Sequence, residues 1–236
     1  MRKCLFALCL VVSSATAAQA DRPFNWTGFY VGAHGGYAGS SIDPAGTYPA
    51  TGAPTQNVEG GVVGFQVGAQ YQWHGGLVTG VEADISFAQL KETARDGNYL
   101  TQTGTINSFG TVRARLGYAM GRFMPFVTAG LAWDRMSQNE TCPDPGAVAV
   151  TTSWCGSVNG RAPYNLRQTQ TNLGWAYGIG FDYAVSNDWS VRLEAMRLEL
   201  DTEEYNLGVM NNGAQNPTKR FEHDIDVVRF ATNMRF

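Results

Sequence analysis

Residues 224–236, DIDVVRFATNMRF, constrain the fold of this chain more than any other stretch. From Val228 onward one alternate set is mostly apolar and the other mostly polar, the pattern of a strand with two different faces. Asp224 and Asp226 break this pattern, because they fall in phase with the apolar set. The stretch ends on Phe236, where a soluble protein usually has a polar tail. Two interpretations stay open here: the last strand of a membrane barrel with lipid on its apolar face, or the edge strand of a soluble β-sandwich.

Residues 1–20 have the three parts of a secretory signal peptide. They begin with Arg2 and Lys3, continue with an apolar run over 4–12, and end on Ala18-Gln19-Ala20, which fits the A-x-A cleavage pattern. The run is too short to span a membrane, and no later stretch approaches the ~18 consecutive apolar residues of a transmembrane helix. The sequence therefore predicts an exported chain that begins at Asp21, with residues 21–236 as one domain.

Charge and cysteine content narrow the possible partners. Loss of residues 1–20 removes two basic residues and no acidic one, so the formal charge changes from −3 to −5. A mildly acidic chain without a basic stripe argues against nucleic acid as a partner. Cys142 and Cys155 remain, and in an exported chain they predict one disulfide. No histidine lies near them to complete a metal site, and no glycine pair precedes a helix as in a phosphate loop, so neither a metal nor a cofactor is expected.

Eight stretches alternate like the last one and predict eight strands. Three short turns, near His74, Gly121 and Asn187, each join two consecutive predicted strands. Four longer polar stretches connect the strands at the opposite end. They run from Gly39 to Asn57, from Phe87 to about Asn107, over 138–170 and over 202–223. Strands of roughly ten residues in even number, with short turns at one end and long loops at the other, are typical of a transmembrane barrel. The predicted strands are 27–39, 59–73, 77–87, 111–118, 127–134, 172–183, 189–200 and 224–236. The predicted fold is therefore an all-β, eight-stranded antiparallel up-and-down transmembrane barrel.

Two local features refine this prediction. Between Ala195 and Met196 the apolar set shifts by one residue, which predicts a β-bulge, or else the end of the strand. Aromatic residues gather near the short turns, where they would form the girdle at the membrane interface. These residues are Trp26, Phe29, Trp73, Tyr118, Phe123, Tyr183, Trp189 and Phe236.

The polar faces of the strands are predicted to line the lumen. Eight strands leave an interior just wide enough for side chains, and isolated buried charges are costly, so opposite charges should pair there. This predicts a filled lumen rather than an open pore. The charged residues assigned to it are Glu82, Asp84, Arg113, Arg115, Asp182, Arg192, Glu194, Arg197, Glu199 and Arg229.

Several motifs resemble those of a known family. WTGFYVG (26–32), the hairpin GVVGFQVGAQYQW (61–73) with LVTGVEADIS (77–86), and TVRARLGYAM (111–120) resemble the small eight-stranded outer-membrane surface proteins of alpha-proteobacteria, of the porin-family or OmpA-type barrel. The resemblance covers essentially all of residues 21–236. It implies a Gram-negative outer-membrane location, surface exposure, a structural role, and Phe236 as the assembly signal for the barrel-insertion machinery. Some members are haemin-binding or weakly pore-forming.

The function predicted from these observations is a structural, surface-exposed barrel that is not an enzyme. It would contribute to envelope integrity, contact outer-membrane lipid, and meet host or environmental ligands through its loops. One alternative is binding of haemin or another small ligand through Tyr164, Tyr205 and His223. A second is a narrow diffusion pore, which a filled lumen disfavours. A third is a lipid-modifying enzyme, which needs a histidine near a serine or acid at the outer rim. His34 should face inward and His74 lies in a turn, so only His223 qualifies, and it is expected to be a solvated loop residue.

Overall fold

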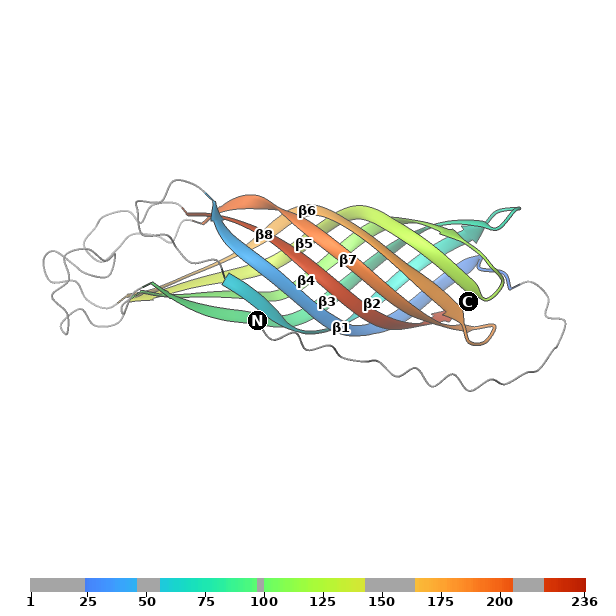
Figure 1. The fold of residues 1–236 in the computed structure, drawn as a ribbon, viewed down its shortest axis with the longest axis horizontal. Helices are drawn as coiled ribbons and strands as arrows, with labels where there is room; N and C mark the ends of the chain where they lie inside the picture. The colour runs from blue at the N-terminus through green and yellow to red at the C-terminus, as the bar shows by residue number, and fades with distance from the viewer. Residues whose placement is uncertain (1–23, 46–55, 97–99, 143–163, 206–218) are drawn as a thin grey trace, which may run out of the picture.

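The computed structural model describes residues 24–45, 56–96, 100–142, 164–205 and 219–236. These residues form one closed antiparallel barrel in which each strand pairs with the next along the chain and the last pairs with the first (Figure 1). The predicted eight-stranded barrel is confirmed. Among the described residues there is no helix long and apolar enough to cross a membrane. The strands are β1 (Gly28–Ala45), β2 (Gln56–Gln72), β3 (Leu77–Asp96), β4 (Leu100–Tyr118), β5 (Phe123–Cys142), β6 (Tyr164–Ala184), β7 (Trp189–Tyr205) and β8 (Lys219–Arg235).

Short connections lie at one end of the barrel, on the right in Figure 1, which we call the turn end: 73–76, 119–122 and 185–188. Glycines make the first two of these tight connections possible, because Gly75, Gly76 and Gly121 all have positive φ. The C-terminus lies at this end, where the backbone N–H of Phe236 donates to the carbonyl of Phe29 at 2.9 Å. That bond continues the pairing of β8 with β1, so the last strand closes the sheet and leaves no edge.

The strands are longer than the sequence predicts, at 17 to 21 residues instead of roughly ten. Much of each predicted loop is strand: β3 continues to Asp96 and β4 already begins at Leu100. The connections at the opposite end, which we call the loop end, comprise residues 46–55, 97–99, 143–163 and 206–218 and lie outside the described residues. A membrane needs only about 9–11 residues of each strand, so the barrel is taller than the membrane it spans.

The outer wall is apolar in the half next to the turn end. Side chains that point outward there include Phe29, Val67, Leu116, Ile179 and Phe230, and all of them are exposed. An apolar surface that runs right round a barrel is not compatible with water, but it suits the hydrocarbon of a bilayer. Towards the loop end the outward positions become polar, as with Glu59, Lys91, Arg135 and Asp226.

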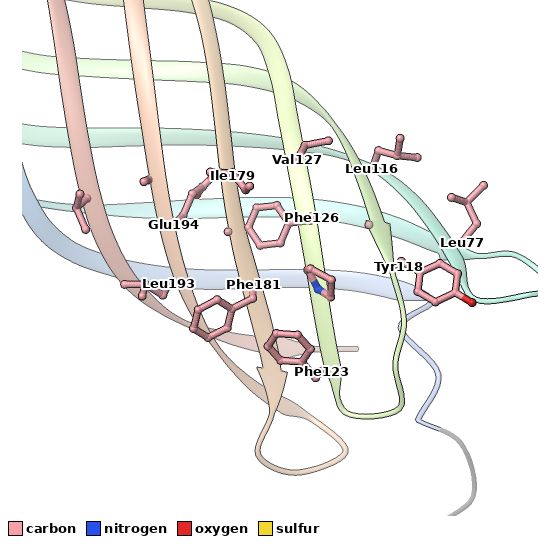
Figure 2. A pocket seen from close by; sticks show the side chains of 15 residues that line it. Leu77, Leu116, Tyr118, Phe123, Phe126, Val127, Ile179, Phe181, Leu193 and Glu194 are labelled. Carbon is pink, nitrogen blue, oxygen red and sulfur yellow. The ribbon is translucent and has the colours of Figure 1, made fainter. Parts of the chain in front are cut away.

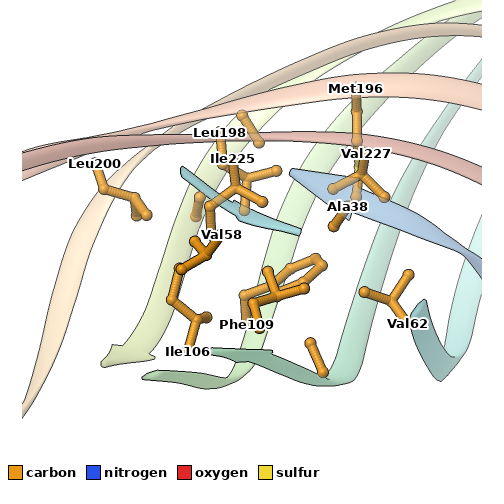
Figure 3. Packing of buried hydrophobic residues seen from close by; sticks show 14 of the residues in the cluster. Ala38, Val58, Val62, Ile106, Phe109, Met196, Leu198, Leu200, Ile225 and Val227 are labelled. Carbon is orange, nitrogen blue, oxygen red and sulfur yellow. The ribbon is translucent and has the colours of Figure 1, made fainter. Parts of the chain in front are cut away.

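The interior changes in the opposite sense. Towards the loop end the lumen holds apolar side chains, which Figure 3 shows pointing at one another from several strands. We call this set the apolar core. A water-soluble barrel has an apolar interior and a polar outer surface, and the half next to the loop end has this arrangement. The half next to the turn end has the reverse, with a polar interior and an apolar outer surface. The apolar core comprises Ala38, Val58, Val62, Ala88, Leu90, Ile106, Phe109, Ala132, Met136, Ala176, Met196, Leu198, Leu200, Ile225 and Val227.

The predicted β-bulge between Ala195 and Met196 is wrong. Ala195 pairs with Ile179 and Met196 with Gly178, so the register is continuous, and the shift in β7 lies between Leu200 and Glu203. Ala195 faces outward, and Met196 faces inward as part of the apolar core. The apolar set changes its phase here because the environment of each face changes, not because the strand slips.

Candidate functional site

Eight charged side chains fill the lumen in the half next to the turn end, and we call them the charge layer. Four are carboxylates and four are guanidinium groups, so their formal charges cancel. All eight are at least 95% buried, and they come from five of the eight strands. They are Glu82 and Asp84 of β3, Arg113 and Arg115 of β4, Asp182 of β6, Arg192 and Glu194 of β7, and Arg229 of β8.

Glu82 lies at the centre of the charge layer. Its Oε1 accepts from Arg113 Nη2 at 2.8 Å, and its Oε2 accepts from Arg192 Nη1 and from the Tyr30 hydroxyl. Arg229 Nη2 lies 3.4 Å from Oε1. This carboxylate therefore has partners on four strands, two of them on the far side of the lumen. A buried charge with that many hydrogen-bonding partners is strongly stabilised, whereas an unpaired one would be very costly.

The other carboxylates are paired in the same way. Glu194 accepts from Arg113 Nη1 at 2.5 Å and from Arg229 Nε at 2.9 Å. Asp182 accepts from Arg192 Nε at 2.7 Å and also from Arg115, and Arg229 Nη1 lies 3.1 Å from Asp84 Oδ1. The guanidinium groups thus bridge neighbouring carboxylates, and the network occupies the section of the lumen where a water-filled path would have to run.

Arg197 and Glu199 do not belong to this layer, so their prediction as lumen residues is wrong. Both side chains point outward, and they are 41% and 53% exposed. Arg197 pairs with Asp226 at 3.2 Å and also with Asp224, while Glu199 accepts from the Tyr177 hydroxyl at 2.6 Å. The error came from the supposed slip at Ala195, which would have turned both charges inward.

Trp26 closes the turn end of the lumen instead of joining the interfacial girdle, so that prediction is also wrong. Its side chain is fully buried, and its indole Nε1 donates to the carbonyl of Gly121 at 3.0 Å. Its backbone N–H donates to Gln72 Oε1 at 2.8 Å. We call the cluster around it the Trp26 cork, which comprises Phe24, Trp26, Val78, Met124 and Ala184.

Arg235, at the end of β8, fastens the Trp26 cork. Its Nη2 donates to the carbonyls of Asn25 at 2.5 Å and Thr27 at 3.2 Å. Its guanidinium group lies 4.5 Å from the centroid of the Phe24 ring, within the range of a cation–π contact. The segment that precedes β1 is therefore tied to β8, next to the seam where the barrel closes.

His223 is buried in the lumen, so the prediction that it is a solvated loop residue is wrong. Its Nε2 lies 2.9 Å from Asp134 Oδ2, and Asp134 Oδ1 accepts from Asn172 Nδ2 at 2.8 Å. The pair escaped the sequence reasoning because His223 and Asp134 are 89 positions apart and meet only through the closed barrel. His34 faces inward as predicted, between Gln66 and Ser86.

The remaining predicted residues divide between described and undescribed parts of the chain. Cys142 ends β5, but Cys155 lies outside the described residues, so the disulfide stays a prediction. Tyr164 begins β6 and Tyr205 ends β7, both at the loop end, and their side chains are not described either. The Phe236 ring is 72% exposed at the turn end. Within the described residues, no group of three or more His, Cys, Asp or Glu side chains could hold a metal ion.

Comparisons with known proteins agree with this architecture. A family model described as outer membrane protein beta-barrel domain matches residues 5–216. The 31 kDa outer-membrane immunogenic protein of Brucella melitensis is 31% identical over 202 residues, which cover 80% of this chain and 76% of the relative. The 22 kDa outer membrane protein of Rhizobium leguminosarum is 27% identical over 188 residues, or 78% of this chain and 68% of the relative.

Among solved structures, the outer membrane protease OmpT of Escherichia coli superposes with a TM-score of 0.51 at 11% identity, over 91% of this chain and 97% of OmpT. At that level of identity the likeness concerns the fold alone.

Proposed function

This chain belongs to the outer membrane protein beta-barrel family, and we propose that it is a non-conducting structural barrel that presents its loop end at the cell surface. It resides in the outer membrane, as its family and its relatives do. In this proposal it contributes to envelope integrity and meets host or environmental partners through the loop end. It has no catalytic role.

The filling of the lumen carries the proposal. Three barriers lie in series along the barrel: the Trp26 cork, the charge layer and the apolar core. The charge layer is neutral as a whole and its members are bonded to one another, so they are not free to attract a passing ion. The side chains of the apolar core offer no polar groups to replace the water around an ion, and the polar residues buried among them, Asp134, His223 and Asn172, are bonded to one another. An eight-stranded barrel of this kind serves as a scaffold better than as a channel.

The buried pair of His223 and Asp134 argues against catalysis. Both side chains are at least 98% buried, so a substrate at the rim could not reach either of them. His223 is, for the same reason, unsuitable as a haemin ligand.

The orientation follows from three of the four connections at the loop end, 46–55, 143–163 and 206–218, which are longer than any connection at the turn end. In outer-membrane barrels the short turns face the periplasm and the long loops face outward. The 31 kDa and 25 kDa relatives from Brucella are named outer-membrane immunogenic proteins, which suits exposure of part of their chains at the surface. The polar outer wall near the loop end also suits a rim that stands above the bilayer.

Conductance and surface labelling test the proposal together. The purified barrel in a planar bilayer is expected to give no stepwise current; discrete reproducible steps would overturn the closed lumen.

The orientation is tested by labelling of single cysteines. In a chain whose Cys142 and Cys155 are replaced by serine, cysteine is placed at Thr93 near the loop end or at His74 in a turn. An impermeant maleimide should label intact cells at position 93 only, and permeabilised cells at both. Labelling of intact cells at position 74 alone would reverse the orientation.

Phe236 is proposed as the assembly signal for the insertion machinery. Phe236→Ala should lower the amount of barrel in the outer membrane and raise the unfolded amount in the periplasm. Phe230→Ala is the matched control, because Phe230 also points outward from β8 and is similarly exposed. Equal losses for both variants would mean that Phe236 acts only as an apolar surface residue.

A further inference from the structure

A groove runs along the outer wall, with most of its lining from β5 to β8, and nothing in the proposed function uses it. It consists of two adjoining hollows of about 650 and 660 Å³. Ala195 belongs to the lining of both, and its side chain is much smaller than those of its pairing partners Ile179 and Val228. The groove therefore lies where a small outward side chain leaves space between larger ones. Four residues line both hollows: Val127, Ile179, Ala195 and Val228.

The end of the groove towards the turn end is apolar. Figure 2 shows Phe123, Phe181 and Leu193 close together there, and the two phenylalanine rings have centroids 5.4 Å apart. These side chains lie within the apolar half of the outer wall, so in the membrane they face hydrocarbon. An acyl chain matches the shape and polarity of this section.

The end towards the loop end is polar. Arg197 and Asp226 line it as a pair 3.2 Å apart, with the rings of Tyr37 and Tyr177 beside them. Asp224 and Glu199 are also bonded to Arg197 or lie near it. One guanidinium group and one carboxylate thus line the polar end. The two further carboxylates beside Arg197 bring the charge of this cluster to −2, at the level where the outer wall changes from apolar to charged.

We propose that this groove binds one outer-leaflet lipid whose headgroup carries both a phosphate and a positively charged amino group. The acyl chain lies over Ala195, the phosphate accepts hydrogen bonds from Arg197, and the amino group donates to Asp226 and its neighbouring carboxylates. The net charge decides the headgroup: a phosphate without an amino group would meet three carboxylates and only one cation. An ordinary annular position has no charged pair fixed at the end of an apolar channel, so this position should retain its lipid longer than the rest of the wall.

Native mass spectrometry of the detergent-solubilised full barrel tests this, after incubation with phosphatidylethanolamine or with phosphatidylglycerol. Phosphatidylethanolamine has the phosphate and the amine, whereas phosphatidylglycerol has the phosphate only. We expect one retained phosphatidylethanolamine, with phosphatidylglycerol bound roughly tenfold more weakly, the effect of losing one hydrogen bond to a charged group. Equal retention of the two lipids would overturn the proposed headgroup.

Two variants locate the site. Ala195→Phe fills the floor of the groove and should abolish the retained lipid, whereas Ala83→Phe should not. Ala83 is the matched control because it also points outward, between Val67 and Val112 of the neighbouring strands, away from the groove. Asp226→Asn should reduce the preference for phosphatidylethanolamine and leave the barrel closed, as judged by a mobility shift on boiling in SDS. Unchanged retention in Ala195→Phe, together with an unchanged lipid preference in Asp226→Asn, would place the lipid elsewhere and refute the groove.

Discussion

Glu82 and Arg192 form an ion pair across the lumen, from strands on opposite walls of the barrel. In a ring of eight strands, β3 and β7 are separated by three strands in either direction. The pair therefore spans the full width of the interior, and Arg113 connects the same Glu82 to Glu194 of β7. These contacts tie the two walls together and at the same time block the path between them.

Glu82→Gln should weaken the barrel far more than the same change at Glu199. The amide removes the negative charge that balances Arg113 and Arg192, and breaking a buried ion pair costs about 3–5 kcal/mol. Glu199→Gln is the control, because that side chain is half exposed on the outer wall and exposed pairs contribute about 0–1 kcal/mol. Urea unfolding of both variants in lipid vesicles measures the difference. Equal losses of unfolding free energy would mean that the charge layer does not stabilise the fold.

His223 and Asp134 should behave as a coupled pair. His223→Leu leaves the carboxylate of Asp134 buried with Asn172 as its remaining described partner, and Asp134→Leu strands the imidazole, so each should cost roughly 3 kcal/mol of unfolding free energy. The double variant should cost less than the sum of the two, by about 1–3 kcal/mol, because neither polar group is then left alone. Strictly additive losses would show that the two side chains stabilise the barrel independently.

Trp26→Ala should open the turn end and destabilise the barrel. Truncation of a fully buried tryptophan costs about 3–5 kcal/mol, and here the indole hydrogen bond to Gly121 is lost as well. Trp73→Ala is the control, since Trp73 lies on the outer wall near the same end and is half exposed. Thermal unfolding followed by the loss of the unboiled band on a gel should show an earlier transition for Trp26→Ala alone. A larger shift for Trp73→Ala would contradict the cork.

Sequence reasoning succeeded where a residue's position depends on its immediate neighbours. The inward orientation of Glu82 and Arg113 follows from the apolar residues on either side of them, and pairing the hairpins in order is enough to build the closed ring. Sequence reasoning failed where the position of a side chain depends on contacts with residues far along the chain. Trp26 looked like one more interfacial aromatic because Gly121 and Gln72, which bind it, are far along the chain. His223 looked solvated because Asp134 is on another strand.

The end of β7 failed for a different reason. The rule that apolar residues point outward holds only beside lipid, and β7 continues beyond that level. From Met196 onward the apolar residues Met196, Leu198 and Leu200 point inward, while Arg197 and Glu199 point outward. If apolar residues are assumed to point outward along the whole strand, this reversal is mistaken for a slipped register. The same reversal explains why Asp224 and Asp226 break the pattern of β8, since they pair with β7 at this level and face outward too.

Cysteine scanning of β7 separates the two interpretations. In a chain with Cys142 and Cys155 replaced by serine, cysteine is introduced singly at Leu193, Met196, Arg197 and Leu198. A continuous register predicts that a water-soluble maleimide labels position 197 and leaves 196 and 198 unmodified in the folded barrel. It also predicts that a fluorophore at position 193 is quenched by brominated lipid.

A slipped register predicts the reverse for the positions beyond Ala195. Met196 and Leu198 would then face lipid, so fluorophores there would be quenched, and Arg197 would lie in the lumen out of reach of the maleimide. Position 193 is quenched under both interpretations and serves as the internal control for lipid contact. Labelling at position 197 together with protection at 196 and 198 would establish that the barrel inverts its two faces within one unbroken strand. It would also show that the loop-end half of the barrel stands in water, with a core of its own.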